Sequence, residues 1–261
     1  MKIEPSGDLD RPSVSRGKME LVGSLSIAAQ QIHNVADTDE ILYAECLARL
    51  TDAHGVVHRA SAFAPQLERK GRSFDLDYRM LDMVTTALAA DGSVVLGSNL
   101  SAENLSDANR FSDILSLIVS RARLASRLIL EITETHPLTD AAIVRLKMLQ
   151  ALGCRVAVDD FGTGYSTPAN LLRIPADIVK IDGSFVHDIR QAEKNCDSLY
   201  HMVAFASCVA PVIVVEGIET ASQLRAARAA GGTHVQGFLL SMPSRLAMPK
   251  IQSDFGLLEG E

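Results

Sequence analysis

Cysteine is scarce in this sequence, and its cysteines lack the spacing that a metal site or a disulfide framework needs. The 261 residues contain four, Cys46, Cys154, Cys196 and Cys208, with no CxxC pair and no regular interval. Neither a zinc ribbon nor a dense disulfide framework is therefore predicted. A reducing compartment suits such a chain, and we expect it to be cytoplasmic.

The sequence also lacks a long apolar run and a secretory signal. Its longest apolar stretch, from about Ala204 to Val215, is interrupted by Ser207 and Pro211, and it is shorter than the roughly 20 residues that cross a bilayer. The first residues are polar, without the apolar centre of a signal peptide. We expect no membrane segment within this chain, with residues 1–20 as a flexible tail or linker and residues 21–261 as one domain.

Positive charge is in deficit as well. Lysine and arginine number 25 against 32 acidic residues, which gives a formal net charge of -7 and a pI near 5.5. A protein that holds a nucleic-acid polymer through its overall field needs a basic face, so that class of function is disfavoured. A small anionic ligand stays compatible with the chain if metal ions supply local positive charge.

What is present, from Leu25 onward, is an alternation of short apolar runs with longer segments of helical period. This pattern is typical of repeated β-α units around a parallel sheet. We expect strands over residues 25–32, 41–47, 94–100, 127–132, 155–158, 178–181, 212–215 and 234–239. We expect helices over residues 76–90, 107–123, 139–152, 196–207 and 221–230. Eight strands suit a closed α/β barrel, so the predicted fold is a TIM-like (β/α)8 barrel.

The first two predicted strands are joined too tightly for a crossover helix. Only Asn34 to Glu40 separates them, whereas a parallel connection needs a dozen or more residues. They should therefore pair as a hairpin, which gives the barrel one antiparallel strand near the N-terminus.

Acidic residues recur at or just beyond the carboxyl ends of the apolar runs. Glu131, the Asp159-Asp160 pair and Glu216 each follow such a run, Glu45 and Asn99 hold comparable places on earlier strands, and Lys180 lies within the run at 178–181. Barrel enzymes build their sites at this end of the strands. We therefore expect these side chains to converge.

A cluster of carboxylates at close range repels strongly unless cations compensate it. Oxygen ligands without a histidine or cysteine cluster favour hard ions, so Mg²⁺ or Mn²⁺ is expected rather than zinc. Two such ions, about 3.5 to 4 Å apart, are a common solution for phosphodiester hydrolysis. The cluster therefore indicates chemistry on phosphate esters.

A purely structural interpretation competes for each of these residues. A single acid after a strand is more often a helix N-cap or a first-turn charge than a ligand. Two adjacent acids before the glycine-containing segment 161–166 are harder to explain, since a turn needs only one. A lysine embedded in an apolar strand, such as Lys180, must face a pocket or a partner charge.

Several ordered blocks resemble the EAL domain family over residues from about Leu25 to Pro243. Residues 159–166 read DDFGTGYS and residues 180–182 read KID, followed by SFV at 184–186, and both blocks are highly specific to the family. In the family's order, the chain also has EITE at 131–134, SNLS at 98–101, EGIET at 216–220 and QGF at 236–238.

This resemblance implies hydrolysis of the second messenger cyclic di-GMP to linear pGpG, with two Mg²⁺ or Mn²⁺ ions, in a homodimer. It implies that the metal ligands are Glu45, Asn99, Glu131, Asp159, Asp160 and Glu216, with Asp159 as the bridge. Lys180 would position or help activate the attacking water, beside Gln236. Contacts to the substrate would come from Arg49, Leu47, Asp160 and Gln30. Glu134 and Glu219, with Gly162 and Thr163, would steady the loop after Asp160.

The chain departs from the family pattern in the segment that gives the family its name. That segment reads Glu45-Cys46-Leu47, with Arg49 two residues on. We interpret Cys46 as a buried packing residue. Two alternatives to an enzyme of this family stay open. One is a receptor that binds cyclic di-GMP without cutting it, which the retention of every matched ligand and of the lysine disfavours. The other is an unrelated barrel enzyme, which six ordered blocks disfavour.

Overall fold

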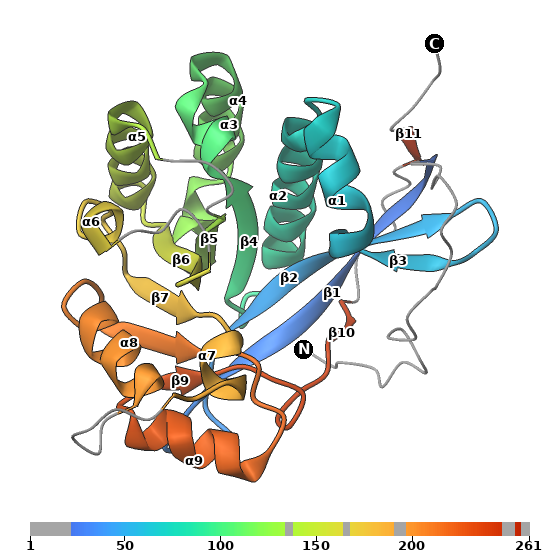
Figure 1. The fold of residues 1–261 in the computed structure, drawn as a ribbon. Coiled ribbons are helices and arrows are strands. Elements are labelled where there is room, and N and C mark those ends of the chain that lie inside the picture. Colours follow the sequence, from blue (N-terminus) through green and yellow to red (C-terminus); the bar gives the residue numbers. More distant parts are fainter. Residues whose placement is uncertain (1–21, 134–137, 164–167, 191–196, 247–253, 257–261) are drawn as a thin grey trace.

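The computed structural model of the protein describes residues 22–133, 138–163, 168–190, 197–246 and 254–256. Among these residues, eight strands close into a barrel with helices packed around it (Figure 1). The barrel strands are β1 (Val22–Asn34), β2 (Ile41–Asp52), β4 (Leu96–Ser101), β5 (Leu128–Thr133), β6 (Arg155–Phe161), β7 (Ile178–Ile181), β8 (Val212–Val215) and β9 (His234–Val235). The predicted TIM-like barrel is thus confirmed.

The order of the strands around the ring confirms the antiparallel hairpin. Strands β2, β4, β5, β6, β7, β8 and β9 follow one another in parallel pairs. Strand β1 closes the ring by pairing antiparallel with both β2 and β9. The connection from Asn34 to Glu40 turns back on itself, and the Asn34 amide donates to the Glu40 carbonyl at 2.9 Å.

Strands β1 and β2 continue past the barrel as a two-stranded ribbon. Their pairing runs from Gly23 opposite Asp52 to His33 opposite Ile41. Three short strands extend this sheet: β3 (Val57–Arg59) on β2, and β10 (Ser244–Arg245) and β11 (Asp254–Gly256) on β1. Sequence periodicity had not predicted these three strands, since runs of two or three residues carry too little pattern.

The helices surround the barrel on its outer side (Figure 1). They are α1 (Ala60–Arg69), α2 (Ser73–Ala90), α3 (Ala102–Ser106), α4 (Ala108–Ser120), the 3-10 helix η1 (Ala122–Arg127), α5 (Asp140–Ala151), α6 (Pro168–Leu171), α7 (Ser184–His187), α8 (Ser198–Ala206) and α9 (Ala221–Ala229). The single helix predicted over residues 107–123 is divided at Arg121 into α4 and η1. In the described part of the chain, none of the helices is long and apolar enough to span a bilayer.

Strict alternation along the strands separates two apolar layers. Residues of one parity face outward and pack against the helices, as Leu96, Leu130 and Val158 do. The other parity faces the barrel interior, where six residues form a separate apolar cluster: Ile32, Tyr43, Ile129, Ala157, Ile178 and Val214. Because side chains alternate with a period of two, the next interior residue on each strand lies one layer closer to the barrel mouth. That next layer carries the polar side chains of the site.

Candidate functional site

The alternation places a lysine and four carboxylates in one interior layer. Two positions beyond the apolar cluster, β2 contributes Glu45, β5 Glu131, β6 Asp159 and β7 Lys180, and Glu216 directly follows β8. The Lys180 side chain is 1% exposed, and its Nζ contacts all four acids. The distances are 3.0 Å to Glu45 Oε2, 2.7 Å to Glu131 Oε2, 2.7 Å to Asp159 Oδ1 and 2.8 Å to Glu216 Oε1.

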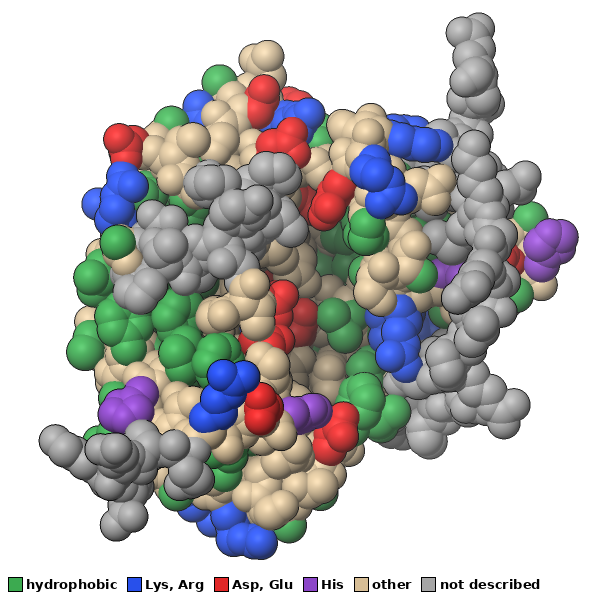
Figure 2. Space-filling model, viewed as in Figure 1, with side chains coloured by type: hydrophobic (Ala, Val, Ile, Leu, Met, Phe, Trp, Pro, Cys, Tyr) green, Lys and Arg blue, Asp and Glu red, His purple; other side chains and the backbone are tan. Residues whose placement is uncertain are grey.

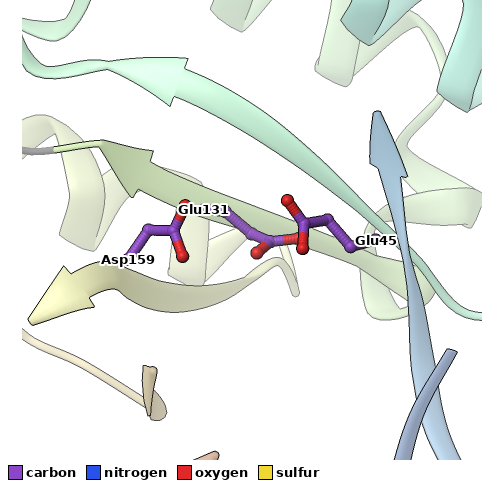
Figure 3. A group of neighbouring side chains, drawn as sticks. All are labelled: Glu45, Glu131 and Asp159. Atoms are coloured by element: carbon purple, nitrogen blue, oxygen red, sulfur yellow. The ribbon is translucent and has the colours of Figure 1, made fainter. Parts of the chain in front are cut away.

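The acids form two groups that share one member. Glu45, Glu131 and Asp159 each offer a ligand atom within 4.8 Å of the others, and so do Asp159, Asp160 and Glu216. Figure 3 shows the first group, with the three carboxylates directed toward a common space from three different strands. The predicted convergence of these side chains is observed, and Asp159 lies where the two groups meet.

Amide side chains complete the surroundings of Glu45. Asn99 on β4 donates from Nδ2 to Glu45 Oε1 at 3.3 Å, and Gln236 donates from Nε2 to Glu45 Oε2 at 2.8 Å. The Gln236 amide also approaches Gln30 Oε1 at 3.3 Å, and Gln30 donates in turn to the Ser241 carbonyl at 3.0 Å. A hydrogen-bonded chain therefore links Glu45 to the segment after β9.

Burial and neighbouring charges shift the pKa values of these groups, and for Lys180 and Glu45 the two effects oppose each other. Burial alone would lower the pKa of Lys180, but the surrounding carboxylates, Asp159 first, raise it well above its ordinary value. Burial would raise the pKa of Glu45, yet Lys180 and the hydrogen bonds from Gln236, Lys180 and Asn99 lower it. Burial, with the charge of Glu45, raises the pKa of Glu131 well above its usual range. The layer is thus short of positive charge.

Asp160 differs from its neighbour in both backbone and exposure. Its φ of 51° lies in the left-handed region, which non-glycine residues seldom adopt. Asp159 faces inward, whereas Asp160 is exposed at the barrel mouth, where partial loss of hydration around its carboxyl group, together with the Asp159 charge, raises the pKa of Asp160 to about 6. The strained turn lets two successive residues both reach the barrel mouth, which a regular strand would prevent.

The loop after Asp160 begins with a tight turn. The Thr163 amide and hydroxyl both donate to the Asp160 carbonyl, at 3.3 Å and 3.1 Å. Gly162 has a φ of 108°, and a side chain there would meet the ring of Phe185. The turn therefore requires glycine at this position.

A pocket of about 300 Å³ opens above the carboxylate layer. Figure 2 shows acidic side chains gathered in a hollow near the centre of the face viewed. The lining residues are Gln30, Glu45, Leu47, Asp182, Gly183, Glu216, Gly217, Glu219, Gln236, Gly237 and Phe238. Arg49, which is 4% exposed, has the same parity on β2 as Glu45 and Leu47.

Some predicted residues are not settled by this geometry, and some pocket residues were not predicted. Glu134 and the predicted tail lie outside the described residues, while Glu219 is exposed on the pocket wall. Asp182, directly after β7, and Phe238, after β9, were missed as lining residues. Asp182 carried a usable signal, because it follows a buried strand as Glu216 does.

The donor set fits divalent cations. Within the described structure, Oε1 of the fully buried Glu131 has no hydrogen-bond partner, and Oε2 contacts the Lys180 ammonium at 2.7 Å. Oxygen atoms of carboxylates, together with the Asn99 amide oxygen, are the ligands that Mg²⁺ and Mn²⁺ prefer. A shared carboxylate between two groups also matches the geometry in which one aspartate bridges two ions.

Comparisons with known proteins agree with the order of the blocks. The family model described as "EAL domain" matches residues 20–243. The chain is 30% identical over 212 residues to "Cyclic di-GMP phosphodiesterase PdeF" of Escherichia coli, which covers 78% of this chain and 28% of that protein. It is 31% identical over 199 residues to "Bifunctional diguanylate cyclase/cyclic di-GMP phosphodiesterase MucR" of Pseudomonas aeruginosa. That match covers 73% of this chain and 29% of MucR. The chain thus spans less than a third of the length of these two curated relatives.

A solved structure shares the fold. The complex described as "PaMucR Phosphodiesterase, c-di-GMP complex" superposes with a TM-score of 0.72 at 29% identity. The match covers 85% of this chain and 97% of that one.

Proposed function

The chain belongs to the EAL domain family, and we propose that it is a metal-dependent phosphodiesterase that hydrolyses cyclic di-GMP to linear pGpG. The observation that carries the proposal is the pair of carboxylate groups that share Asp159 beside the Lys180 ammonium. The named activities of PdeF and MucR support the choice of substrate. Because the matched region covers less than a third of each of those proteins, the activity of this chain rests on its own site.

Two Mg²⁺ or Mn²⁺ ions would occupy the two carboxylate groups. Glu45, Asn99, Glu131 and Asp159 would hold one ion, and Asp159, Asp160 and Glu216 the other. Two ions there would neutralise the charge that develops on the phosphodiester during attack by water. The carboxylates themselves cannot neutralise this charge, because they are negatively charged like the phosphodiester.

Lys180 and Gln236 both donate to Glu45 from the barrel interior. The Lys180 ammonium donates to Glu45 and Asp159, which lets it orient a water molecule held between the two groups. Gln236 fixes the orientation of Glu45 with a 2.8 Å hydrogen bond. Both residues therefore serve the chemistry by holding acceptors and water in one geometry.

Substrate contacts would come from the wall of the pocket and from Arg49 and Asp160, which lie near it on β2 and β6. The Arg49 guanidinium, a fixed fork of donors, suits a phosphate of cyclic di-GMP. Leu47 and Gln30 line the pocket next to Glu45, and Asp160 is exposed beside Asp159 and Glu216. The turn at Gly162 and Thr163 would hold the loop after Asp160, with Glu134 and Glu219 as further supports.

We also propose a homodimer, formed through an exposed apolar patch. Val144 and Met148 are one turn apart on α5 and are 58% and 44% exposed, and Leu172, directly after α6, is 62% exposed. The ion pair between Arg173 and Asp140 shows that the residue next to Leu172 reaches the N-terminal end of α5. Exposed aliphatic groups in one place mark a protein contact more often than open surface does.

The enzyme is tested by comparing wild type with Glu45→Gln in an assay for pGpG. Glutamine keeps the size of Glu45 but removes its charge, so hydrolysis should fall at least about a hundredfold, as for loss of a metal ligand. Asp113→Asn, an exposed position on α4, is the matched control and should cleave like wild type. If wild type binds cyclic di-GMP without cleaving it, the protein is a receptor and not an enzyme.

A further inference from the structure

At one position that faces the barrel interior, strand β4 has a glycine and therefore no side chain. Gly97 pairs with Glu45 on β2 and with Ile129 on β5. Its neighbours Leu96 and Leu100 pack in the outer core, so the alternation points position 97 into the barrel. The register partners of Gly97 on the two flanking strands, Glu45 and Ile129, both carry side chains, whereas β4 leaves a space at this position.

Two buried side chains fill that space. A Cβ atom built on Gly97 would overlap Oε1 of Glu131, and it would lie 2.7 Å from Cε2 of Tyr43 and 3.1 Å from Cδ of Glu131. Glu131 and Tyr43 are 0% and 1% exposed. Real Cβ atoms do not approach other atoms this closely, so a side chain at position 97 would have to displace one or both neighbours.

Neither neighbour can yield easily. Tyr43 belongs to the apolar cluster that fills the barrel below the site, together with Ile129 and Ile178. Glu131 is fixed from the other side by Lys180, at 2.7 Å. The carboxylate therefore stands between the bare Gly97 backbone, the Tyr43 ring and the Lys180 ammonium.

We propose that Gly97 is a positioning residue for Glu131, and that its missing side chain sets the distance of this carboxylate from Glu45 and Asp159. The inference rests on the proposed function, because the placement of Glu131 matters for activity only if Glu45, Glu131 and Asp159 hold a metal ion. Gly97 does not touch the ion or the substrate; it acts through Glu131, which is its nearest side-chain neighbour.

The first test is a titration with Mn²⁺ alone, followed by calorimetry, with no nucleotide present. Gly97→Ala should bind Mn²⁺ at least about tenfold more weakly than wild type, since a ligand displaced from its position loses much of its contribution. Gly92→Ala is the matched control, because a Cβ atom there meets nothing within 4 Å. Equal Mn²⁺ affinity of the two variants would overturn the proposal.

The second test is a double-mutant cycle on thermal unfolding in EDTA, which needs no metal. If Gly97 acts through Glu131, then Gly97→Ala lowers the melting temperature in the wild-type background and by at most half as much in the Glu131→Ala background. Should Gly97→Ala alone fail to fold, the double variant is expected to fold. Additive effects, or a double variant that also fails to fold, would refute the coupling.

The two tests separate this inference from the proposed function. A wild-type protein that binds Mn²⁺ and shows the coupling, but cleaves no cyclic di-GMP, would overturn the phosphodiesterase and support the role of Gly97. If the wild-type protein cleaves the substrate but Gly97→Ala binds Mn²⁺ normally, the phosphodiesterase is supported and the role of Gly97 is overturned.

Discussion

The Nζ of Lys180 lies 2.7 Å from Oδ1 of Asp159, and this pair is at the centre of the site. Asp159 is the acid that belongs to both carboxylate groups, and Lys180 is the cation that contacts members of both. One ammonium therefore faces four carboxyl groups in the described structure, and the raised pKa values of Glu131 and Glu216 indicate that it is too little positive charge for all four to ionise. Divalent cations would supply the remainder.

Replacement of Lys180 should affect both catalysis and the metal-free fold. Lys180→Met should reduce pGpG formation by about a hundredfold or more, since it removes a group that orders the attacking water. In EDTA it should also destabilise the protein by about 3 kcal/mol, because buried carboxylates lose their partner. Steady-state rates and urea unfolding measure the two effects. Lys70→Met, on the exposed end of α1, is the control, and a Lys180 variant that matches it in both measurements would contradict this role.

The sharing of Asp159 predicts a difference in metal stoichiometry among the ligands. Asp159→Ala should lose both ions, whereas Glu131→Ala and Glu216→Ala should each retain one, because each belongs to a single group. Calorimetric titration with Mn²⁺ reports the number of ions bound. Retention of one ion by Asp159→Ala would show that the groups are independent.

Arg49 is expected to contribute to binding more than to turnover. Arg49→Lys keeps the charge but loses the planar fork of donors, so KM for cyclic di-GMP should rise roughly tenfold with a smaller change in kcat. Arg59→Lys, at the exposed end of β3, is the comparison. A variant in which kcat falls and KM stays constant would place Arg49 in the chemical step.

Asp77 on α2 gives a prediction about pH that is independent of the metal ligands. Its Oδ2 accepts from the Ser101 amide and from Asn104 Nδ2, both at 2.7 Å, and burial raises its pKa to about 7 from an ordinary 3.8. A carboxyl with a raised folded pKa binds its proton more tightly when folded. Its contribution to stability is therefore full below about pH 4 and is lost as the pH rises through about 7.

Asp77→Asn should remove this titration while it keeps an oxygen acceptor. At pH 8 the variant should be more stable than wild type by about 1 kcal/mol or more, and the difference should shrink toward pH 4. Urea unfolding in EDTA across this range measures the trend. Parallel stability curves for the two proteins would mean that Asp77 does not titrate in this way.

Much of the fold follows from local pattern. The eight barrel strands were placed by apolar runs, although the last ends at Val235 and not at residue 239 as predicted, and the hairpin followed from the length of the connection at Asn34 to Glu40. Helix α1 was missed because Pro65 lies inside it, and an interior proline argues against a helix. The structure has the helix because Phe63 and Leu67 are fully buried, a tertiary effect that no local pattern displays.

The site was predictable where its residues follow buried strands. Glu131, Asp159, Lys180 and Glu216 could be found because strand ends meet at one side of a barrel. Cys46 was correctly interpreted as a packing residue, since it is 1% exposed in the outer core. Position 97 could not be interpreted from sequence, because the space that its glycine leaves is filled by residues from two other strands.

The proposed dimer is tested by the size of the protein in solution. Val144→Glu places a charge in the apolar patch on α5 and should convert a dimer into a monomer in analytical ultracentrifugation. Val119→Glu, which is also exposed but lies on α4, should leave the dimer intact. A dimer that survives Val144→Glu would move the contact to another surface.

The central claim is the hydrolysis of cyclic di-GMP at the Asp159 site, and chromatography of the nucleotides tests it most directly. Purified wild-type protein is incubated with cyclic di-GMP and Mg²⁺ or Mn²⁺, with and without EDTA. Linear pGpG should appear with either ion and should be absent in EDTA. Intact cyclic di-GMP in the presence of both ions would contradict the account.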